Sequence, residues 1–220
     1  MIMKLNNVMI FGDSYSTYRN HIPQGYATYY ADEPIKPTDV TNVENTWWHR
    51  LFSFAGANLI RNDSWSGSTI CYTGYNGADC SKTSSFIYRL RTLKAEGFFA
   101  DNKIDTVFVF GATNDSWCGA PQGEPKYSDW QEEDLYCSLP AIPCFLTELK
   151  ATLPDADIVI VINTNLKKTI VAVFKEMCER LGLRCVELVD IDKESGHPSV
   201  LGMAQIEEQI VKTLEIEPKE

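Results

Sequence analysis

The sequence predicts a single α/β domain in which a mostly parallel sheet of about five strands lies between two layers of helices. Short apolar runs alternate with longer segments of helical periodicity along all 220 residues, which is the pattern of repeated strand–helix–strand units. The segment Thr106–Phe110 is continuously apolar or β-branched, as is typical of a strand buried on both faces of a parallel sheet. No linker, repeat or low-complexity segment interrupts this pattern, so residues 1–220 are expected to form one domain.

Five short apolar runs are the expected strands. The first, Val8–Phe11, leads directly into Gly12-Asp13-Ser14, where the glycine allows backbone angles that other residues avoid. The next two runs also lead into small polar turns, at 62–69 and 111–115. In chain order the expected strands are 8–11, 57–61, 104–110, 158–162 and 185–188.

Helical periodicity fills the intervals between these strands. Thr46 is placed to cap the first helix and Gly56 to end it, and its apolar residues recur at helical spacing. Its expected buried face carries Trp47, Leu51 and Phe54. Pro198 suits the first turn of the last helix, where a missing N–H costs no hydrogen bond. The expected helices are 47–57, 85–99, 132–152, 166–181 and 198–214.

Two long segments show no sustained periodicity. Residues 15–45 are rich in Tyr, Pro and polar residues and are expected to form an ordered surface excursion. Residues 116–130 are too irregular for a helix or strand, and loops of this length in a compact domain are usually functional or mobile. In the helix that follows, Pro140 and Pro143 are expected to cause a bend.

The composition excludes several classes of function. A formal net charge of −10 disfavours sequence-independent binding to nucleic acid, which needs clustered Lys and Arg. No apolar run reaches the length of a membrane span, and Met1–Asn7 lacks the features of a secretory signal. If the chain is complete, we therefore expect a cytoplasmic protein that does not bind membranes and whose ligand is a small molecule.

The seven cysteines do not form a metal site in this interpretation. None of them belongs to a C-x-x-C pair, so neither a zinc site nor a thioredoxin-like redox motif is predicted. No metal and no other cofactor is expected.

The predicted sheet brings four turns together at one edge. All strands of a parallel sheet end on the same side, and ligands bind in the crevice outside those ends. Ser14, Gly67, Asn114 and His197 are therefore expected to form one site. A serine hydroxyl is a weak nucleophile until a base such as histidine accepts its proton. Two backbone N–H groups, of Ser14 and Gly67, and the Asn114 amide are candidate donors to the oxyanion of an acyl-transfer intermediate.

At these residues the sequence resembles the SGNH or GDSL hydrolases, a family named for a Ser, a Gly, an Asn and a His in separate blocks. The likeness covers residues 8–210. It implies a flavodoxin-like, three-layer α/β/α fold and metal-independent ester hydrolysis, with Ser14 as the nucleophile and His197 as the general base. The four blocks here are Gly12-Asp13-Ser14, the 62–69 turn with Gly67, the 111–115 turn with Asn114, and His197-Pro198.

The chain departs from the family pattern at the acid that orients the histidine. The family usually has an Asp three residues before the His, where this chain has Glu194, while Asp192 lies five residues before it. Either side chain could meet the imidazole. We favour Asp192, because Glu194 has an ordinary role as an exposed turn residue; Asp190 is a third candidate, and Asp13 is expected to hold the first turn together.

Aromatic side chains are unusually frequent in the loops near the predicted site. Aromatic faces suit a flat apolar ligand such as a sugar ring, so we expect an ester substrate that is an O-acetylated carbohydrate. The competing interpretation is that some of these rings pack loops onto the core or cover a dimer interface. The predicted substrate-binding residues are Trp65, Tyr72, Trp117 and Trp130, with Tyr75 and Tyr127 as further members of the group.

A binding protein is the alternative to an enzyme. In that interpretation the fold is kept without the chemistry, and the aromatic loops bind a carbohydrate. The unusual spacing of the acid is the feature that favours it. The sequence does not predict an oligomeric state.

Overall fold

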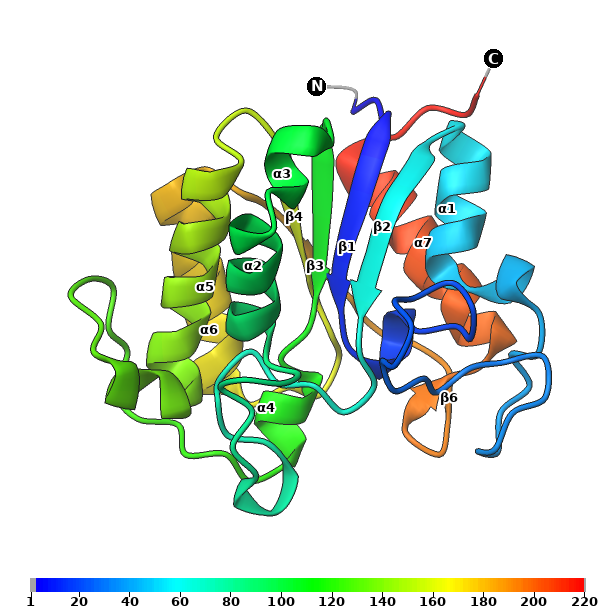
Figure 1. The fold of residues 1–220 in the computed structure, drawn as a ribbon. Coiled ribbons are helices and arrows are strands. Elements are labelled where there is room, and N and C mark those ends of the chain that lie inside the picture. Colours follow the sequence, from blue (N-terminus) through cyan, green and yellow to red (C-terminus); the bar gives the residue numbers. More distant parts are fainter. Residues whose placement is uncertain (1–2, 220) are drawn as a thin grey trace.

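A five-stranded parallel sheet forms the centre of the molecule (Figure 1). The computed structural model describes residues 3–219. The strand order is β2-β1-β3-β4-β5, and every neighbouring pair is parallel, which confirms the predicted fold class. From β1 the chain first adds β2 on one side and then adds β3, β4 and β5 on the other side. The strand order therefore switches between β1 and β3, and doubly wound folds bind ligands at such a switch point. The strands are β1 (Asn7–Gly12), β2 (Asn58–Ser64), β3 (Thr106–Phe110), β4 (Asp157–Ile162) and β5 (Arg184–Glu187).

Helices cover both faces of the sheet. In Figure 1, α1 and α7 lie on one side and α2, α5 and α6 on the other. Alternate side chains of β1 lie in the two hydrophobic cores. Val8 and Ile10 pack in the core under α1 and α7, and Met9 and Phe11 pack in the core under α2, α5 and α6. The helices are α1 (Trp47–Ala55), α2 (Phe86–Ala95), α3 (Phe98–Asp101), α4 (Thr113–Trp117), α5 (Ser138–Thr152), α6 (Lys168–Leu181) and α7 (Val200–Leu214).

The first helix matches the prediction at its ends and differs on its buried face. The Thr46 side chain accepts a hydrogen bond from the His49 N–H, and Gly56 ends α1 in the left-handed conformation. Phe54, however, remains 36% exposed, while Trp48 and Phe52 are buried. These two residues extend the apolar stripe to the opposite side of Trp47 and Leu51, which leaves Phe54 at its margin.

Several predicted boundaries were wrong, one because a strand continues through polar residues and two because a local turn interrupts a helix. Residues 62–64 continue β2, since they pair with β1 as far as Gly12. Gly97, with a φ of 77°, separates α2 from α3. The expected helix 132–152 is a 3₁₀ turn, η4 (Glu132–Tyr136), followed by α5. Pro140 lies in the first turn of α5, where proline is tolerated.

A small hairpin that the sequence analysis did not predict precedes α7. Strands β6 (Lys193–Glu194) and β7 (His197–Pro198) pair in antiparallel fashion. The two residues between them, Ser195 and Gly196, both have positive φ, as in a two-residue type I′ turn. Pro198 therefore lies in this "His197 hairpin" and not in the helix, and Ser199 caps α7.

The three remaining 3₁₀ turns are η1 (Ser14–Ser16), η2 (Val43–Asn45) and η3 (Tyr75–Gly77). Within residues 3–219, every helix is too short or too polar to cross a membrane.

Candidate active site

Ser14 lies at the carboxyl end of β1, in a turn that a small residue makes possible. Gly12 has no room for a side chain, because a Cβ there would lie 2.3 Å from the Ser64 Oγ. Asp13 caps η1 by accepting a hydrogen bond of 3.1 Å from the Tyr15 N–H. Ser14 is the first residue of this short turn, so its hydroxyl is presented at the sheet edge while the residue is only 4% exposed.

His197 meets this serine from the hairpin. The His197 Nε2 lies 2.9 Å from the Ser14 Oγ, although 183 residues separate the two in sequence. The other ring nitrogen, Nδ1, lies 3.4 Å from the main-chain oxygen of Ser195. A carbonyl oxygen only accepts, so this contact favours the tautomer with the proton on Nδ1 and a free lone pair on Nε2.

The two candidate acids lie near His197 in sequence but are not bonded to it. The Asp192 carboxylate accepts a hydrogen bond from the Ser199 hydroxyl. Glu194 is the ladder partner of His197 and points to solvent. Asp190 is exposed as well. Among residues 3–219, no carboxylate forms a hydrogen bond or ion pair with the imidazole.

The surroundings of His197 keep its imidazole neutral. The pKa of His197 is lowered to about 4, mainly by burial. The hydrogen bond to the Ser195 carbonyl acts in the opposite direction, and the positive charge of Lys193 lowers the pKa further. At neutral pH the ring is therefore unprotonated and able to accept a proton from Ser14.

Among residues 3–219, the three predicted oxyanion donors keep N–H groups that are free of protein partners. Within the described chain, neither the Ser14 N–H nor the Gly67 N–H has a hydrogen-bond partner, and Gly67 adopts a φ of 81° that a side chain would strain. The Asn114 amide nitrogen donates to the Ser68 carbonyl at 2.9 Å, and its oxygen accepts from the Tyr75 hydroxyl at 2.9 Å. These contacts fix the orientation of the amide and leave its second N–H available.

A buried guanidinium ties two of these turns together. Arg89, from α2, is 1% exposed and forms an ion pair of 2.7 Å with the fully buried Asp63. The same side chain donates to the Gly12 carbonyl and to the Ser68 Oγ, each at 3.3 Å. The residues next to Asp13-Ser14 and to Gly67 therefore share one anchor.

Two further buried carboxyls support the site. Asp115 accepts hydrogen bonds from the Ile70 and Cys71 N–H groups, at 2.9 and 3.0 Å, so it joins the Asn114 helix to the loop after Gly67. Asp13 is fully buried, and one of its oxygens, Oδ2, has no hydrogen-bond partner in the described chain. Burial raises the pKa of Asp13 to about 7 and also raises that of Asp115.

The structure brings only part of the predicted aromatic group to this edge. The Trp117 ring, 40% exposed, lies 6.4 Å from the His197 ring. Trp65 is partly buried and packs against Tyr26, with ring centroids 4.2 Å apart and ring planes tilted by 34°. Tyr72, in contrast, is 3% exposed and belongs to the core.

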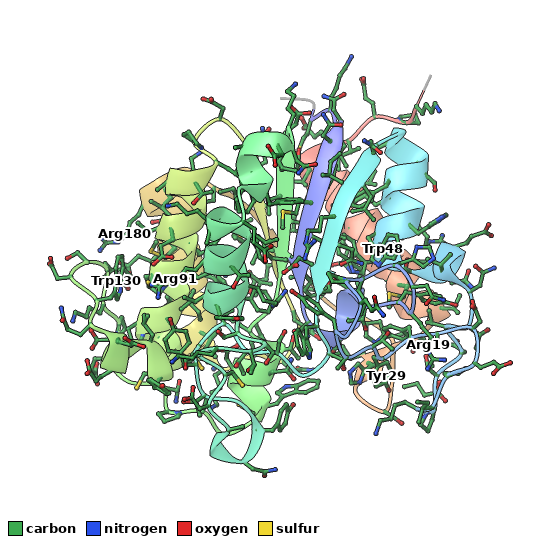
Figure 2. The ribbon with its side chains drawn as sticks, in the orientation of Figure 1. Arg19, Tyr29, Trp48, Arg91, Trp130 and Arg180 are labelled. Carbon is green, nitrogen blue, oxygen red and sulfur yellow. The ribbon has the colours of Figure 1, made fainter. Side chains whose placement is uncertain are left out.

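Trp130 was predicted to bind substrate and lies elsewhere. It donates to the Lys126 carbonyl and packs against the core, and Figure 2 shows it on the α5 side of the molecule, away from Tyr29. Tyr127 belongs to the same region, where Arg180 lies over its ring. The irregular 118–130 segment thus folds onto α5 and α6, which periodicity could not indicate.

Tyr29 was missed by the sequence analysis. Its ring stacks on the His197 imidazole with centroids 3.6 Å apart and an interplanar angle of 7°. The abundance of Tyr in residues 15–45 was the available signal, but it did not identify which tyrosine reaches the site.

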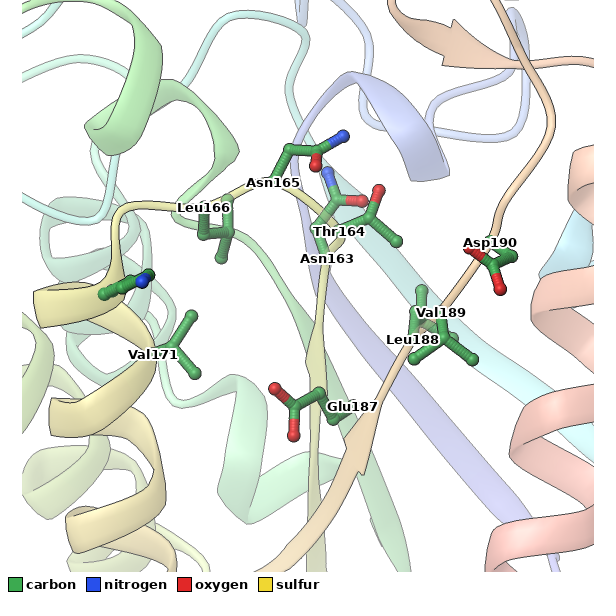
Figure 3. A pocket seen from close by; sticks show the side chains of 10 residues that line it. Asn163, Thr164, Asn165, Leu166, Val171, Glu187, Leu188, Val189 and Asp190 are labelled. Carbon is green, nitrogen blue, oxygen red and sulfur yellow. The ribbon is translucent and has the colours of Figure 1, made fainter.

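A cavity of about 390 Å³ opens at the same sheet edge, between the carboxyl ends of β4 and β5 and the start of α6 (Figure 3). Asn163 and Thr164, in its lining, accept hydrogen bonds of 3.3 and 2.5 Å from the Lys193 Nζ. The cavity therefore adjoins the His197 hairpin.

Comparison with solved structures identifies close structural counterparts. A GDSL-like lipase from Bacteroides ovatus has a TM-score of 0.89 and 41% identity, with 97% of this chain and 99% of that chain covered. A second, from Bacteroides uniformis, has a TM-score of 0.88 and 41% identity, with 96% of each chain covered.

More distant structures share the fold. A family two carbohydrate esterase from Clostridium thermocellum, solved with cellohexaose, has a TM-score of 0.65 and 18% identity over 97% of this chain and 65% of that one. At this identity the likeness shows the fold alone.

No protein of curated function matches the chain significantly. A family model for the GDSL-like lipases and acylhydrolases matches residues 6–214, which include Ser14, Gly67, Asn114 and His197. With the two structures at 41% identity, this match shows that the chain belongs to the GDSL-like lipase/acylhydrolase family.

Proposed function

We propose that the protein is a serine esterase that uses Ser14 and His197. The observation that carries the proposal is the 2.9 Å contact between the Ser14 Oγ and the His197 Nε2, which is the geometry of a nucleophile and its general base. Membership of a family of ester-acting hydrolases supports the same reaction class.

In the proposed mechanism, His197 accepts the hydroxyl proton as the Ser14 Oγ attacks the ester carbonyl. The negative charge that develops on the carbonyl oxygen receives hydrogen bonds from the N–H groups of Ser14 and Gly67 and from the Asn114 amide. The imidazolium then gives its proton to the leaving alcohol, and water releases the acyl group by the same steps in reverse.

The proposed base works without a carboxylate partner. The Asp192 side chain is engaged by Ser199 and Glu194 points to solvent, so we assign neither to the imidazole. The Ser195 carbonyl is the acceptor that faces Nδ1. A carbonyl dipole stabilises an imidazolium less than a full negative charge does, which is consistent with the low pKa of His197.

The proposed substrate is an O-acetylated carbohydrate. Trp117 and Tyr75 are exposed by 40% and 44%, and they contact His197 and Asn114 respectively. Exposed aromatic faces of this kind bind sugar rings. The similarity in fold to a carbohydrate esterase supports the same class.

The test is intact mass spectrometry after incubation with a fluorophosphonate, with Ser14→Ala as the matched variant. The esterase proposal requires a single adduct on the native chain and none on Ser14→Ala. Acetylated xylose or glucose oligomers are then compared with aryl esters of longer acyl chains. If only the longer aryl esters are hydrolysed, the carbohydrate part of the proposal is wrong.

A carbohydrate-binding protein without catalysis is the competing function. It predicts no adduct on the folded native chain, saturable binding of sugars, and the same affinity for Ser14→Ala. Adduct formation together with turnover would exclude it.

A further inference from the structure

The His197 imidazole has weak hydrogen-bonded support for a general base. The contact between its Nδ1 and the Ser195 oxygen is long, at 3.4 Å, and hydrogen bonds weaken quickly beyond about 3.2 Å. Such a bond alone leaves the ring free to rotate away from Ser14. Another contact must therefore fix the plane of the ring.

Tyr29 supplies a contact of that kind. Its ring lies parallel to the imidazole, at an angle of 7° and a centroid distance of 3.6 Å. Of the ring pairs in the described chain that involve His197, this pair alone is stacked; those with Tyr15, Tyr30 and Trp117 are tilted or edge-on at 5.3 to 6.5 Å.

The backbone around Tyr29 is tied to both halves of the site. The Tyr29 N–H donates to the Thr17 Oγ1 at 2.9 Å, and the same hydroxyl donates to the Ser14 carbonyl at 3.0 Å. The next residue, Tyr30, is fully buried and donates its hydroxyl to the Pro198 carbonyl at 3.0 Å. Residues 29–30 thus bridge the turn of the nucleophile and the strand of the base.

We propose that Tyr29 is a positioning residue for His197, and that its stacked ring takes over the orienting role that an acidic side chain has in a catalytic triad. This inference rests on the proposed esterase function. In a triad the acid holds the imidazole and stabilises its charged form. A flat ring restricts the same rotation, and it covers one face of the imidazole from water.

Other charged or titratable groups surround the imidazole and set its proton affinity together with Tyr29. Their effects must remain constant in any comparison of variants, which favours substitutions at Tyr29 alone. These groups are Lys193 and Glu194 from β6, Tyr15 and Ser14 from η1, and Tyr30 from the bridging segment.

Three substitutions at position 29 separate stacking from other roles. Tyr29→Phe keeps the flat ring and removes only the hydroxyl, whose one contact is a marginal 3.5 Å to the Pro37 carbonyl. Tyr29→Leu fills much of the space without a flat ring, and Tyr29→Ala leaves it open. The substrate is a small acetate ester, and kcat and KM are measured from pH 3 to 9.

Tyr29→Phe is expected to retain the kcat of the native chain. Tyr29→Leu and Tyr29→Ala are each expected to lose kcat by roughly 10²-fold, the effect of a misplaced catalytic group, with little change in KM. A Tyr29→Leu variant that keeps the native kcat would overturn the proposal, and so would an equal loss in Tyr29→Phe.

A measurement that does not need activity separates this inference from the esterase proposal. The imidazole of His197 is titrated by NMR in the native chain, in Tyr29→Phe and in Tyr29→Ala, and thermal unfolding verifies that each variant is folded. Tyr29→Ala opens one face of the imidazole to water, so we expect the pKa of His197 to rise in this variant and to stay unchanged in Tyr29→Phe. Unchanged titration in folded Tyr29→Ala would overturn the positioning role, whereas a missing fluorophosphonate adduct on the native chain would overturn the esterase proposal.

Discussion

The two halves of the candidate site are held in different ways. The half that carries Ser14, Gly67 and Asn114 is fixed by hydrogen bonds to buried charged groups, chiefly Arg89 and Asp115. The half that carries His197 is a hairpin with two residues in each strand. Apart from its 2.9 Å contact with the Ser14 Oγ, its imidazole has one long bond to a carbonyl and one stacked ring, that of Tyr29.

The difference separates two ways to position a reacting group. Hydrogen bonds to buried charged groups are directional, and the buried groups are costly to leave unpaired. Such bonds therefore fix backbone N–H groups to within a fraction of an ångström. Ring stacking is less directional within the plane and tolerates small shifts. A donor to an oxyanion needs the first kind of support, whereas a base that moves a proton back and forth can function with the second.

The largest expected effect tests the hydrogen-bonded half. Arg89→Met removes the shared anchor and the buried partner of the Asp63 Oδ2, while Arg61 still pairs with the Asp63 Oδ1 at 2.8 Å, so we expect a loss of about 3 kcal/mol in the free energy of unfolding, the lower end of the cost of breaking a buried ion pair. Denaturant titration measures this loss. A change below about 1 kcal/mol, the scale of an exposed ion pair, would mean that the network is not the main support of this half.

Removing a donor should lower the rate, and because Asn114 also bonds to Ser68 and Tyr75, its removal should lower the free energy of unfolding by about 1 to 3 kcal/mol. Asn114→Ala is expected to lower kcat for an acetate ester by about 10² to 10³-fold, as at other oxyanion sites, with little change in KM. Asn102→Ala, at the opposite end of the sheet, is the matched control and should retain the native kcat. Equal kcat in both variants would remove Asn114 from the proposed mechanism.

The pH dependence of activity tests whether a carboxylate contacts the His197 imidazole. Because the pKa of His197 is lowered to about 4, the imidazole is neutral above that value, and kcat/KM should fall tenfold per pH unit only below about pH 4. A carboxylate partner would raise this pKa. An acidic limb centred near pH 6.5 would therefore indicate an acid contact that is absent from this structure.

The smallest expected effect concerns the two acids favoured by the sequence. Glu194→Gln should change kcat by no more than about twofold, the range of substitutions away from special contacts. Asp192→Asn should act only through the Ser199 cap of α7, seen as a lower melting temperature. A triad acid would cost about 10⁴-fold in kcat, so such a loss in either variant would restore the triad.

The reacting residues of both halves could be predicted from sequence, Ser14, Gly67 and Asn114 in one and His197 in the other, but the ring that stacks on His197 could not. Gly12-Asp13-Ser14 and Asn114 occur where a strand ends, and their backbone conformations and hydrogen bonds require particular residue types. Tyr29 lies in a long aperiodic segment, where ring stacking imposes no spacing that a pattern could detect. The acid was predicted from its spacing to His197, and spacing did not reveal that Glu194 is an exposed residue opposite His197 in a hairpin, with no hydrogen bond to the imidazole in the described chain.

The buried carboxyl of Asp13 has a consequence for the proton balance of folding. The pKa of Asp13 rises to about 7 in the folded chain and that of His197 falls to about 4, against about 3.9 and 6.5 in an unfolded chain. Between about pH 4 and 6.5, folding therefore takes up a proton at Asp13 and releases one at His197. The uptake at Asp13 and the release at His197 cancel, so the pair leaves stability independent of pH in this range.

Outside that range the balance is lost. Above about pH 6.5 only Asp13 still takes up a proton, so its contribution to stability declines as the pH rises through 7. Below about pH 4 both groups are protonated in the folded and the unfolded chain, and the contribution of His197 has been lost as the pH fell through its folded value. Folding in weak acid thus favours the neutral forms of both side chains, so the residue proposed to act as a base is already unprotonated in the folded chain.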